Sequence, residues 1–329
     1  MRTRKPIASL SLDLDNKWSY MKTHGDPGWE SLPSYLHVVV PRFLRLLETL
    51  DLTITVFIVG QDAALAQNAE LMATIAAAGH EIGNHSFHHD VWLNLYSEAE
   101  VETELCRAEE SIERATGRVP HGFRGPGFCL SRTVVQVLAR RGYLYDASTL
   151  PTFVGPLARA FYVRTSTLSR EELQRRQALF GGFRDGLRPN RPYRWRTDGG
   201  ELIEIPVTTM PVFRVPIHAS YVVYLSALAP GLAVRYFRAA LALCRLTGTA
   251  PSVLLHPLDF LGCDDMKELA FFPGMKLTSG RKLELLGDVL RLLSAQFTVV
   301  PLQEQARRVA LDAPLPLREP VFRHADNVV

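Results

Sequence analysis

The sequence has few cysteines, no excess of charge of one sign and no long apolar run. Its four cysteines, Cys106, Cys129, Cys244 and Cys263, form no C-x-x-C pair, so we expect reduced thiols and no disulfide framework. The 37 basic and 34 acidic residues give a net charge of +3 and are spread along the chain. This distribution argues against a nucleic-acid-binding protein, because such a protein needs a basic patch.

No stretch reaches the roughly eighteen uncharged apolar residues that a membrane-spanning helix requires. The nearest, residues 215–244, is interrupted by Pro230, Gly231, Arg235 and Arg238. Its second half is typical of an amphipathic helix that packs on the core, or that rests its apolar face on a membrane surface. The N-terminal residues MRTRKPIASLSLDLD lack the apolar region of a signal peptide. We therefore expect a cytoplasmic protein, with peripheral contact at the inner face of the membrane as an alternative.

Segments typical of strands and helices alternate along most of the chain, and this alternation predicts a parallel α/β barrel or a doubly wound sheet. We expect one domain over residues 1–329. Residues 155–200, rich in Arg, Gly and Pro, break the alternation and are predicted to be an insertion with a short helix near 169–180. The insertion either shapes a substrate pocket or is a solvated loop. Residues 311–329 are expected to form a loose tail. The predicted strands cover 7–15, 53–60, a short segment through 82, 119–124, 143–146, 201–207, 252–256 and 297–300, and the predicted helices cover 34–50, 68–78, 97–115, 131–141, 232–246, 281–294 and 303–310.

Two pairs of polar residues follow predicted strands. Asp13 and Asp15 are two residues apart at the end of the first strand, so their side chains point to the same side. His85 and His89, in IGNHSFHHD, are four apart and would point the same way from a single helical turn. Because parallel strands end at one edge of a sheet, both pairs are expected to meet there. Two imidazoles and one carboxylate, with a position left for water, are the ligand set of a catalytic zinc-type site.

Five short motifs in order make the chain similar to the NodB-type polysaccharide deacetylases, carbohydrate esterase family 4. They are SLDLD, GHEIGNHSFHH with its H-S-x-x-H core, FRGPGF, YLYDAS and LLHP, and the match extends from about residue 7 to residue 300. The resemblance implies a distorted (β/α)7–8 barrel with an inserted segment. The D-x-D form of the first motif and the segment EIPVT also resemble the undecaprenyl-phosphate formamido-arabinose deformylases of the same superfamily.

The resemblance assigns a metal site and a general base. Asp15, His85 and His89 would bind one divalent ion, with zinc the first choice and cobalt, nickel or manganese as alternatives. Asp13 would take a proton from the water on that ion. Arg124 would lie beside Asp13 and keep its carboxylate ionised.

The resemblance also assigns the remaining catalytic groups. The backbone N–H of Gly127 would donate to the oxyanion, and His256 would protonate the leaving amine. The fourth motif places an acid, Asp146, where it would tune the general acid, although the tryptophan expected near it is absent, which leaves a strand-capping role open. Trp18 and Phe128, next to catalytic motifs, would stack on a sugar face or close the core.

The implied reaction is metal-dependent hydrolysis of the N-acetyl or N-formyl amide of an amino-sugar glycoconjugate, either a free precursor or a lipid-linked one. One alternative is a cyclic amide or cyclic imide hydrolase of the same superfamily. The other is an inactive sugar-binding module, which should lack a metal ligand or the base; none is missing from the sequence.

Overall fold

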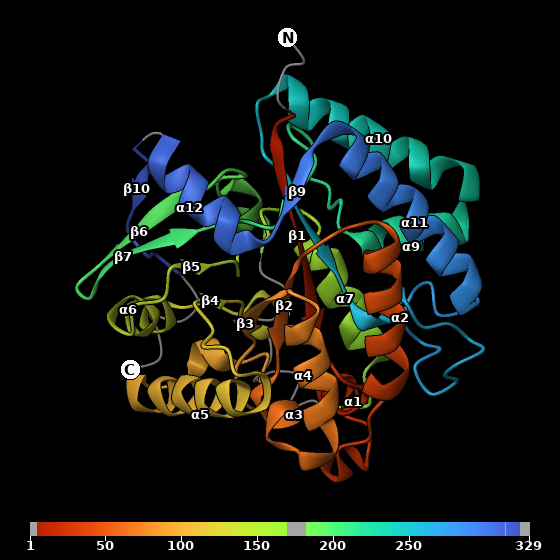
Figure 1. The fold of residues 1–329 in the computed structure, drawn as a ribbon, viewed down its shortest axis with the longest axis horizontal. Helices are drawn as coiled ribbons and strands as arrows, with labels where there is room; N and C mark the ends of the chain where they lie inside the picture. The colour runs from red at the N-terminus through yellow and green to blue at the C-terminus, as the bar shows by residue number, and fades with distance from the viewer. Residues whose placement is uncertain (1–4, 170–181, 313, 323–329) are drawn as a thin grey trace.

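The computed structural model describes residues 5–169, 182–312 and 314–322. Over these ranges ten strands form one sheet, with helices packed around it (Figure 1). The strands are β1 (Ile7–Leu14), β2 (Thr55–Ile58), β3 (Glu81–Asn84), β4 (Gly122–Phe123), β5 (Tyr145–Asp146), β6 (Tyr193–Thr197), β7 (Gly200–Glu204), β8 (Ser252–Leu255), β9 (Thr298–Val300) and β10 (Leu317–Arg318).

The strand order is β10-β6-β7-β5-β4-β3-β2-β1-β8, with β9 paired to β1. Every pairing is parallel except β6 with β7. The predicted parallel α/β fold class is therefore confirmed.

The helices are α1 (Lys17–His24), α2 (Leu36–Thr49), α3 (Gly60–Ala64), α4 (Ala69–Ala77), α5 (Glu98–Thr116), α6 (Arg132–Arg140), α7 (Gly155–Thr165), α9 (Ala219–Leu228), α10 (Pro230–Leu246), α11 (Ser279–Gln296) and α12 (Leu302–Asp312).

The register of the sheet brings the polar strand ends to one edge. Asp13 is opposite Phe57, Ile58 is opposite Asn84, and Asn84 is opposite Phe123. The residues after β1, β3 and β4 therefore emerge side by side, since parallel strands end at the same edge of a sheet. This edge carries the motifs that contain Asp15, His85 and Arg124.

The helix α5 shows how local sequence fixes an element at this edge. Ser97 and Glu100 form a reciprocal capping box at its start, and Gly117 ends it in a left-handed conformation with φ 66°. The predicted inward face is buried, as its leucine Leu105 and its alanine Ala108 show. A further buried residue on the helix, Glu104, is polar and acts on the site described below.

Two predictions about irregular segments need correction. The 155–200 segment is not a plain excursion, because it begins with α7 and contributes β6, which pairs antiparallel with β7. The tail is not loose throughout: β10 pairs parallel with β6. A strand of two residues has no periodicity, so the sequence could not indicate it. The helix expected near 169–180 lies outside the described residues except for its first position. Among the described helices, none has the length and apolar character needed to cross a bilayer.

Candidate metal and active site

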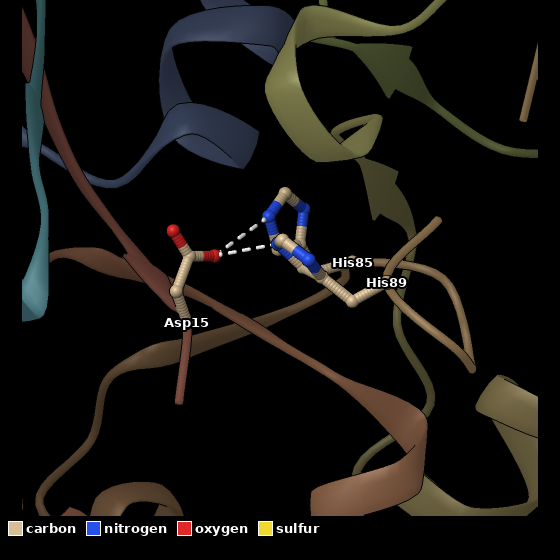
Figure 2. A group of neighbouring side chains, drawn as sticks. All are labelled: Asp15, His85 and His89. Atoms are coloured by element: carbon tan, nitrogen blue, oxygen red, sulfur yellow. Dashed lines mark hydrogen bonds and ion pairs between the residues drawn. The ribbon is translucent and has the colours of Figure 1, made fainter. Parts of the chain in front are cut away.

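Three of the predicted site residues meet at the edge of the sheet. Asp15 follows β1, and His85 and His89 follow β3 (Figure 2). The Oδ1 of Asp15 lies 3.2 Å from the Nε2 of His85 and 2.9 Å from the Nε2 of His89. All three side chains are buried, and each offers a ligand atom within 4.8 Å of the others. The predicted convergence of the carboxylate with the two imidazoles is therefore confirmed.

The two histidines do not share a helical turn, so that expectation was wrong. Ser86 and His89 have left-handed backbones, with φ 61° and 54°. The side chain of Asn84 accepts a hydrogen bond from the Ser86 N–H at 2.8 Å, and the Ser86 hydroxyl accepts one from the His89 N–H at 3.2 Å. This tight turn aims both imidazoles at Asp15 at the cost of strained backbone, which is frequent at functional sites.

Glu104, on α5, holds the turn from behind. Its Oε1 accepts hydrogen bonds from the N–H groups of Phe87 (2.9 Å) and His88 (2.6 Å), and its Oε2 lies 2.8 Å from the Nδ1 of His88. Burial alone would raise the pKa of Glu104, but the hydrogen bonds from His88 hold that pKa below its usual value. His88 is thereby turned toward α5 and does not join the cluster.

The donor set fits a divalent cation. The Nδ1 of His85 lies 2.6 Å from the carbonyl oxygen of Arg124, so it carries the proton and the Nε2 lone pair faces Asp15. Although burial opposes ionisation, the neighbouring His89 and His85 hold the pKa of Asp15 well below its usual value. An ionised carboxylate and an imidazole with a free Nε2 are the forms that bind a metal ion.

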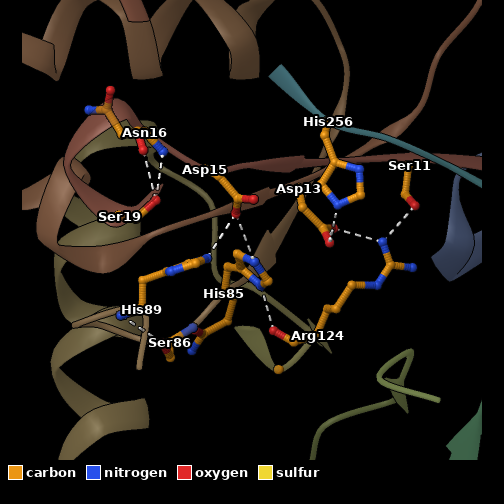
Figure 3. A network of polar contacts seen from close by, with 12 residues as sticks. Ser11, Asp13, Asp15, Asn16, Ser19, His85, Ser86, His89, Arg124 and His256 are labelled. Carbon is orange, nitrogen blue, oxygen red and sulfur yellow. Dashed lines mark hydrogen bonds and ion pairs between the residues drawn. The ribbon is translucent and has the colours of Figure 1, made fainter. Parts of the chain in front are cut away.

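Asp13 lies beside this cluster and is paired with Arg124 (Figure 3). The Nη1 of Arg124 donates to the Oδ1 of Asp13 at 2.7 Å and to the Ser11 hydroxyl at 2.8 Å, and its Nε donates to the carbonyl of Ala147 at 2.9 Å. The other oxygen of Asp13, Oδ2, lies 3.9 Å from the Nε2 of His256. One carboxylate oxygen is thus fixed by the guanidinium, while the other faces the imidazole.

Two residues that sequence reasoning missed hold His256. The hydroxyl of Ser220, in the first turn of α9, lies 3.1 Å from the Nδ1 of His256. The backbone N–H of His256 donates to the Oδ2 of Asp259 at 2.8 Å, and Ser220 also hydrogen-bonds Asp259. The position of Asp259, three residues after His256 in HPLD, could have indicated it; no local signal marks Ser220.

Asp146 does not contact the imidazole that it was expected to tune. It accepts a hydrogen bond from the Ser148 hydroxyl at 2.6 Å, and that hydroxyl accepts one from the Gly125 N–H at 2.8 Å. Burial raises the pKa of Asp146, and burial together with the neighbouring Asp146 raises the pKa of Glu204 well above its usual value. Asp146 supports the FRGPGF turn through Ser148.

The remaining predicted residues divide between cavity wall and core. Gly127 and Phe128, with φ 59° and 63°, form a left-handed turn and line the cavity at the site. Trp18 is 1% exposed and donates its indole N–H to Asp62 at 3.0 Å. Its ring lies edge-on to His89, at 6.4 Å between centroids. Trp18 therefore packs behind the cluster and cannot stack on a sugar, whereas Phe128 is open to the cavity.

The cavity has a volume of about 550 Å³ and contains the cluster, Asp13 and His256 in its wall. Much of the rest of the wall is aromatic. Burial, together with the neighbouring His256, lowers the pKa of His218 in this wall well below its usual value, so that imidazole is neutral. The aromatic part of the wall includes Tyr20 of α1, Phe161 of α7, Tyr221 and Tyr224 of α9, and Phe271 and Phe272.

Part of the chain is similar to one family of known proteins. Residues 26–145 match the family described as Polysaccharide deacetylase. The chain is 31% identical over 127 residues to the peptidoglycan deacetylase of Helicobacter pylori; the matched region covers 39% of this chain and 41% of that protein. The chain thus spans less than half of the length of this relative.

Two solved structures share the fold. One, from Mycobacterium smegmatis and named provisionally as a polysaccharide deacetylase, is 21% identical with a TM-score of 0.63 and covers 98% of this chain and 97% of its own. The other, a probable polysaccharide deacetylase from Pseudomonas aeruginosa PAO1, is 18% identical with a TM-score of 0.56 and covers 94% and 92%. The expected NodB-type distorted barrel is thereby confirmed as the fold.

Proposed function

We propose that this chain is a metal-dependent hydrolase of the polysaccharide deacetylase family, carbohydrate esterase family 4, acting on the N-acetyl or N-formyl amide of an amino-sugar glycoconjugate. The observation that carries the proposal is the meeting of Asp15, His85 and His89 in one cavity wall with Asp13 beside them and His256 opposite. The family match over residues 26–145 supports the same reaction class.

Asp15, His85 and His89 would hold one divalent ion, with zinc the first choice and cobalt, nickel or manganese as alternatives. When bound, the ion polarises the amide carbonyl and makes water acidic enough to attack at neutral pH. The fixed Nδ1 of His85 and the depressed pKa of Asp15 support this assignment.

Asp13 would be the general base. Its Oδ1 is held by Arg124, so Oδ2 is left to accept the proton of the attacking water. The oxygen of that water bonds to the amide carbon, and the negative charge develops on the former carbonyl oxygen. The backbone N–H of Gly127, at the cavity wall, would donate to this oxygen.

His256 would be the general acid. The carbon–nitrogen bond breaks as the Nε2 proton passes to the nitrogen, so the products are a carboxylic acid and a free amine. Ser220 keeps the Nδ1 side of the ring occupied, which directs Nε2 toward Asp13 and the cavity. Asp259 would stabilise the protonated ring through Ser220.

A cyclic amide or imide hydrolase would use the same groups on a small heterocycle, and an inactive sugar-binding module would lack one of them. All the groups assigned above are present, which disfavours the second alternative. The size of the cavity supports a substrate larger than one heterocyclic ring, because such a ring would fill little of a volume of about 550 Å³.

The test is release of acetate and formate from N-acylated amino sugars, presented as free oligosaccharides, nucleotide-linked sugars and lipid-linked sugars, with hydantoin-like rings in the same panel. The Asp13→Asn variant should lose about 10²- to 10⁴-fold in kcat while it keeps its metal. Ring opening without acyl release would favour the alternative hydrolase. Full activity of Asp13→Asn would exclude Asp13 as the base.

A further inference from the structure

Exposed apolar side chains are concentrated in one part of the described chain. Of the seventeen large hydrophobic side chains that are more than a third exposed there, nine lie between residues 153 and 215. Isolated exposed leucines are common on protein surfaces, but a contiguous group marks an interaction site. Six of these residues, which we call the apolar rim, are Leu157 and Phe161 on α7, Phe183 and Leu187 in the 3-10 turn Phe183–Leu187, and Val212 and Phe213 in a later turn.

The three segments of the rim meet at residues 151–153. The ring of Phe153 lies against Gly186, so closely that a Cβ there would be 2.3 Å from it. The hydroxyl of Thr152 donates to the carbonyl of Arg214 at 2.8 Å, and the hydroxyl of Thr209 donates to the carbonyl of Pro151 at 3.0 Å. The 3-10 turn and the later turn are therefore both packed onto the start of α7.

The turn that carries Val212 and Phe213 is strained and exposed. It is closed by a hydrogen bond from the Met210 N–H to the Val215 carbonyl at 2.8 Å. Val212 has a φ of 72°, which is rare for a β-branched residue. Its side chain is 76% exposed and that of Phe213 is 62% exposed. Neither side chain contributes to the core, so the strain presents two apolar groups to the surroundings.

The rim is also basic. Residues 151–169, 182–191 and 208–217 contain six arginines and one acidic residue, Asp185. That carboxylate is already paired, since it lies 2.9 Å from the Nε of Arg188. Arg164 on α7 and Arg184 in the 3-10 turn are exposed. A protein surface that combines exposed apolar side chains with arginines and has few acidic groups complements a lipid bilayer, which has an apolar interior and anionic headgroups.

We propose that the apolar rim is a docking surface for an anionic lipid bilayer, with Val212 and Phe213 inserted among the lipids and the exposed Arg164 and Arg184 at the headgroups. The helix α7 also connects this surface to the cavity, because Ala158 and Phe161 line the cavity while Leu157 is 72% exposed. An amphiphilic substrate could pass from the bilayer to the cavity along one helix.

This location differs from the second half of residues 215–244, for which the sequence left contact with a membrane surface open. Tyr221 and Tyr224 of α9 line the cavity, and the outer face of α10 presents Arg235, Arg238 and Arg245. In α10, Phe237 and Leu241 are buried in the core. Core packing explains the buried face of α10, whereas Leu228 of α9 and Leu232 and Leu246 of α10 are exposed.

The test is co-sedimentation of the full chain with vesicles of phosphatidylcholine, with and without phosphatidylglycerol. We expect binding to the vesicles that contain phosphatidylglycerol, weaker binding at high salt, and a loss of about tenfold in partitioning for the double variant Val212→Asp, Phe213→Asp. The matched control is Val119→Asp, Leu311→Asp, which adds the same charge at side chains that are 51% and 85% exposed outside the rim.

The proposal is overturned if the wild type ignores anionic vesicles, if the rim variant binds as well as the wild type, or if the control variant loses as much binding. Self-association through the rim, detected by size-exclusion chromatography, with no vesicle binding would assign the surface to a second copy of the chain instead. Each measurement is independent of catalysis, so hydrolysis of a free acetylated sugar by both double variants reports separately on the fold and on the proposed reaction.

Discussion

The guanidinium of Arg124 and the carboxylate of Asp13 form a buried ion pair, with 2.7 Å between Nη1 and Oδ1. The pair joins the end of β1 to the end of β4, and thus the first motif to the third. Ser11 and Ala147 accept further hydrogen bonds from the Nη1 and Nε of Arg124, whereas its buried Nη2 has no hydrogen-bond partner among the described residues. The pair therefore sets the position of the proposed base.

Removal of the guanidinium should destabilise the fold. Arg124→Met leaves the Asp13 carboxylate buried without its partner, so the free energy of unfolding should fall by about 3–5 kcal/mol, measured by urea denaturation of metal-free protein at pH 7. The double variant with Asp13→Asn should recover part of that loss. The exposed Arg140, which pairs with Glu98 and Glu102, is the control, and Arg140→Met should leave the free energy of unfolding nearly unchanged. Equal effects of the two single variants would contradict a buried pair.

Loss of one imidazole should abolish metal retention. His89→Ala removes a ligand from a three-ligand site, so the metal content measured by plasma mass spectrometry should fall from about one ion per chain to a small fraction. Added zinc should raise the melting temperature of the wild type and leave that of the variant unchanged. His37→Ala, at an exposed position on α2, should behave as the wild type. A variant that still holds one ion would show that the cluster is not the site.

Ser220→Ala should affect turnover more than binding. In this variant the Nδ1 of His256 loses its hydrogen bond to the Ser220 hydroxyl. Because that hydrogen bond is strongest when the imidazole is charged, we expect kcat to fall about tenfold and KM to stay nearly unchanged. The alkaline limb of the pH–rate profile should move to lower pH, and Ser220→Thr should restore most of the activity. Ser226→Ala is the control, because Ser226 is also buried on α9 but bonds only the Val223 carbonyl. A uniform loss without a pH change would indicate a structural role.

Lys282 should make stability depend on pH in the alkaline range. It donates to the Leu258 carbonyl at 2.7 Å, and burial lowers its pKa from 10.5 to about 8. Between these values the folded chain binds fewer protons than the unfolded chain, so stability rises with pH there. The wild type should therefore gain up to about 3 kcal/mol relative to Lys282→Met across that interval. Denaturation at pH values on both sides of it measures the difference, and Lys276→Met is the exposed control. A constant difference would contradict the lowered pKa.

The elements with strong local signals were predictable. The capping box and inward face of α5 and the eight residues of β1 agree with the structure to within one or two residues. The strands β4 and β5 each pair over two residues only. The sequence predicted longer strands, because extended residues next to a paired segment have the same sequence pattern as the paired residues. For β10 there was no pattern at all.

The site divides in the same way. Asp13, Asp15, His85 and His89 were found from spacing, because each pair lies within one short segment. Ser220 was not found, since its partner His256 is 36 residues away and the contact depends on how α9 packs beside β8. The orientation of Trp18 also could not be predicted from the sequence, because its hydrogen bond to Asp62 joins residues that are 44 positions apart.

The position of β1 in the sheet has a consequence for how the chain folds. This strand pairs with β2 at residues 55–58, but also with β8 at 252–255 and with β9 at 298–300. A growing polypeptide must leave one side of its first strand unpaired until most of its length has been synthesised, and contacts so distant in sequence slow folding. We expect slow refolding in vitro and a need for chaperones during biosynthesis. Nascent chains that end before β8 should be cleaved by protease more readily than longer chains.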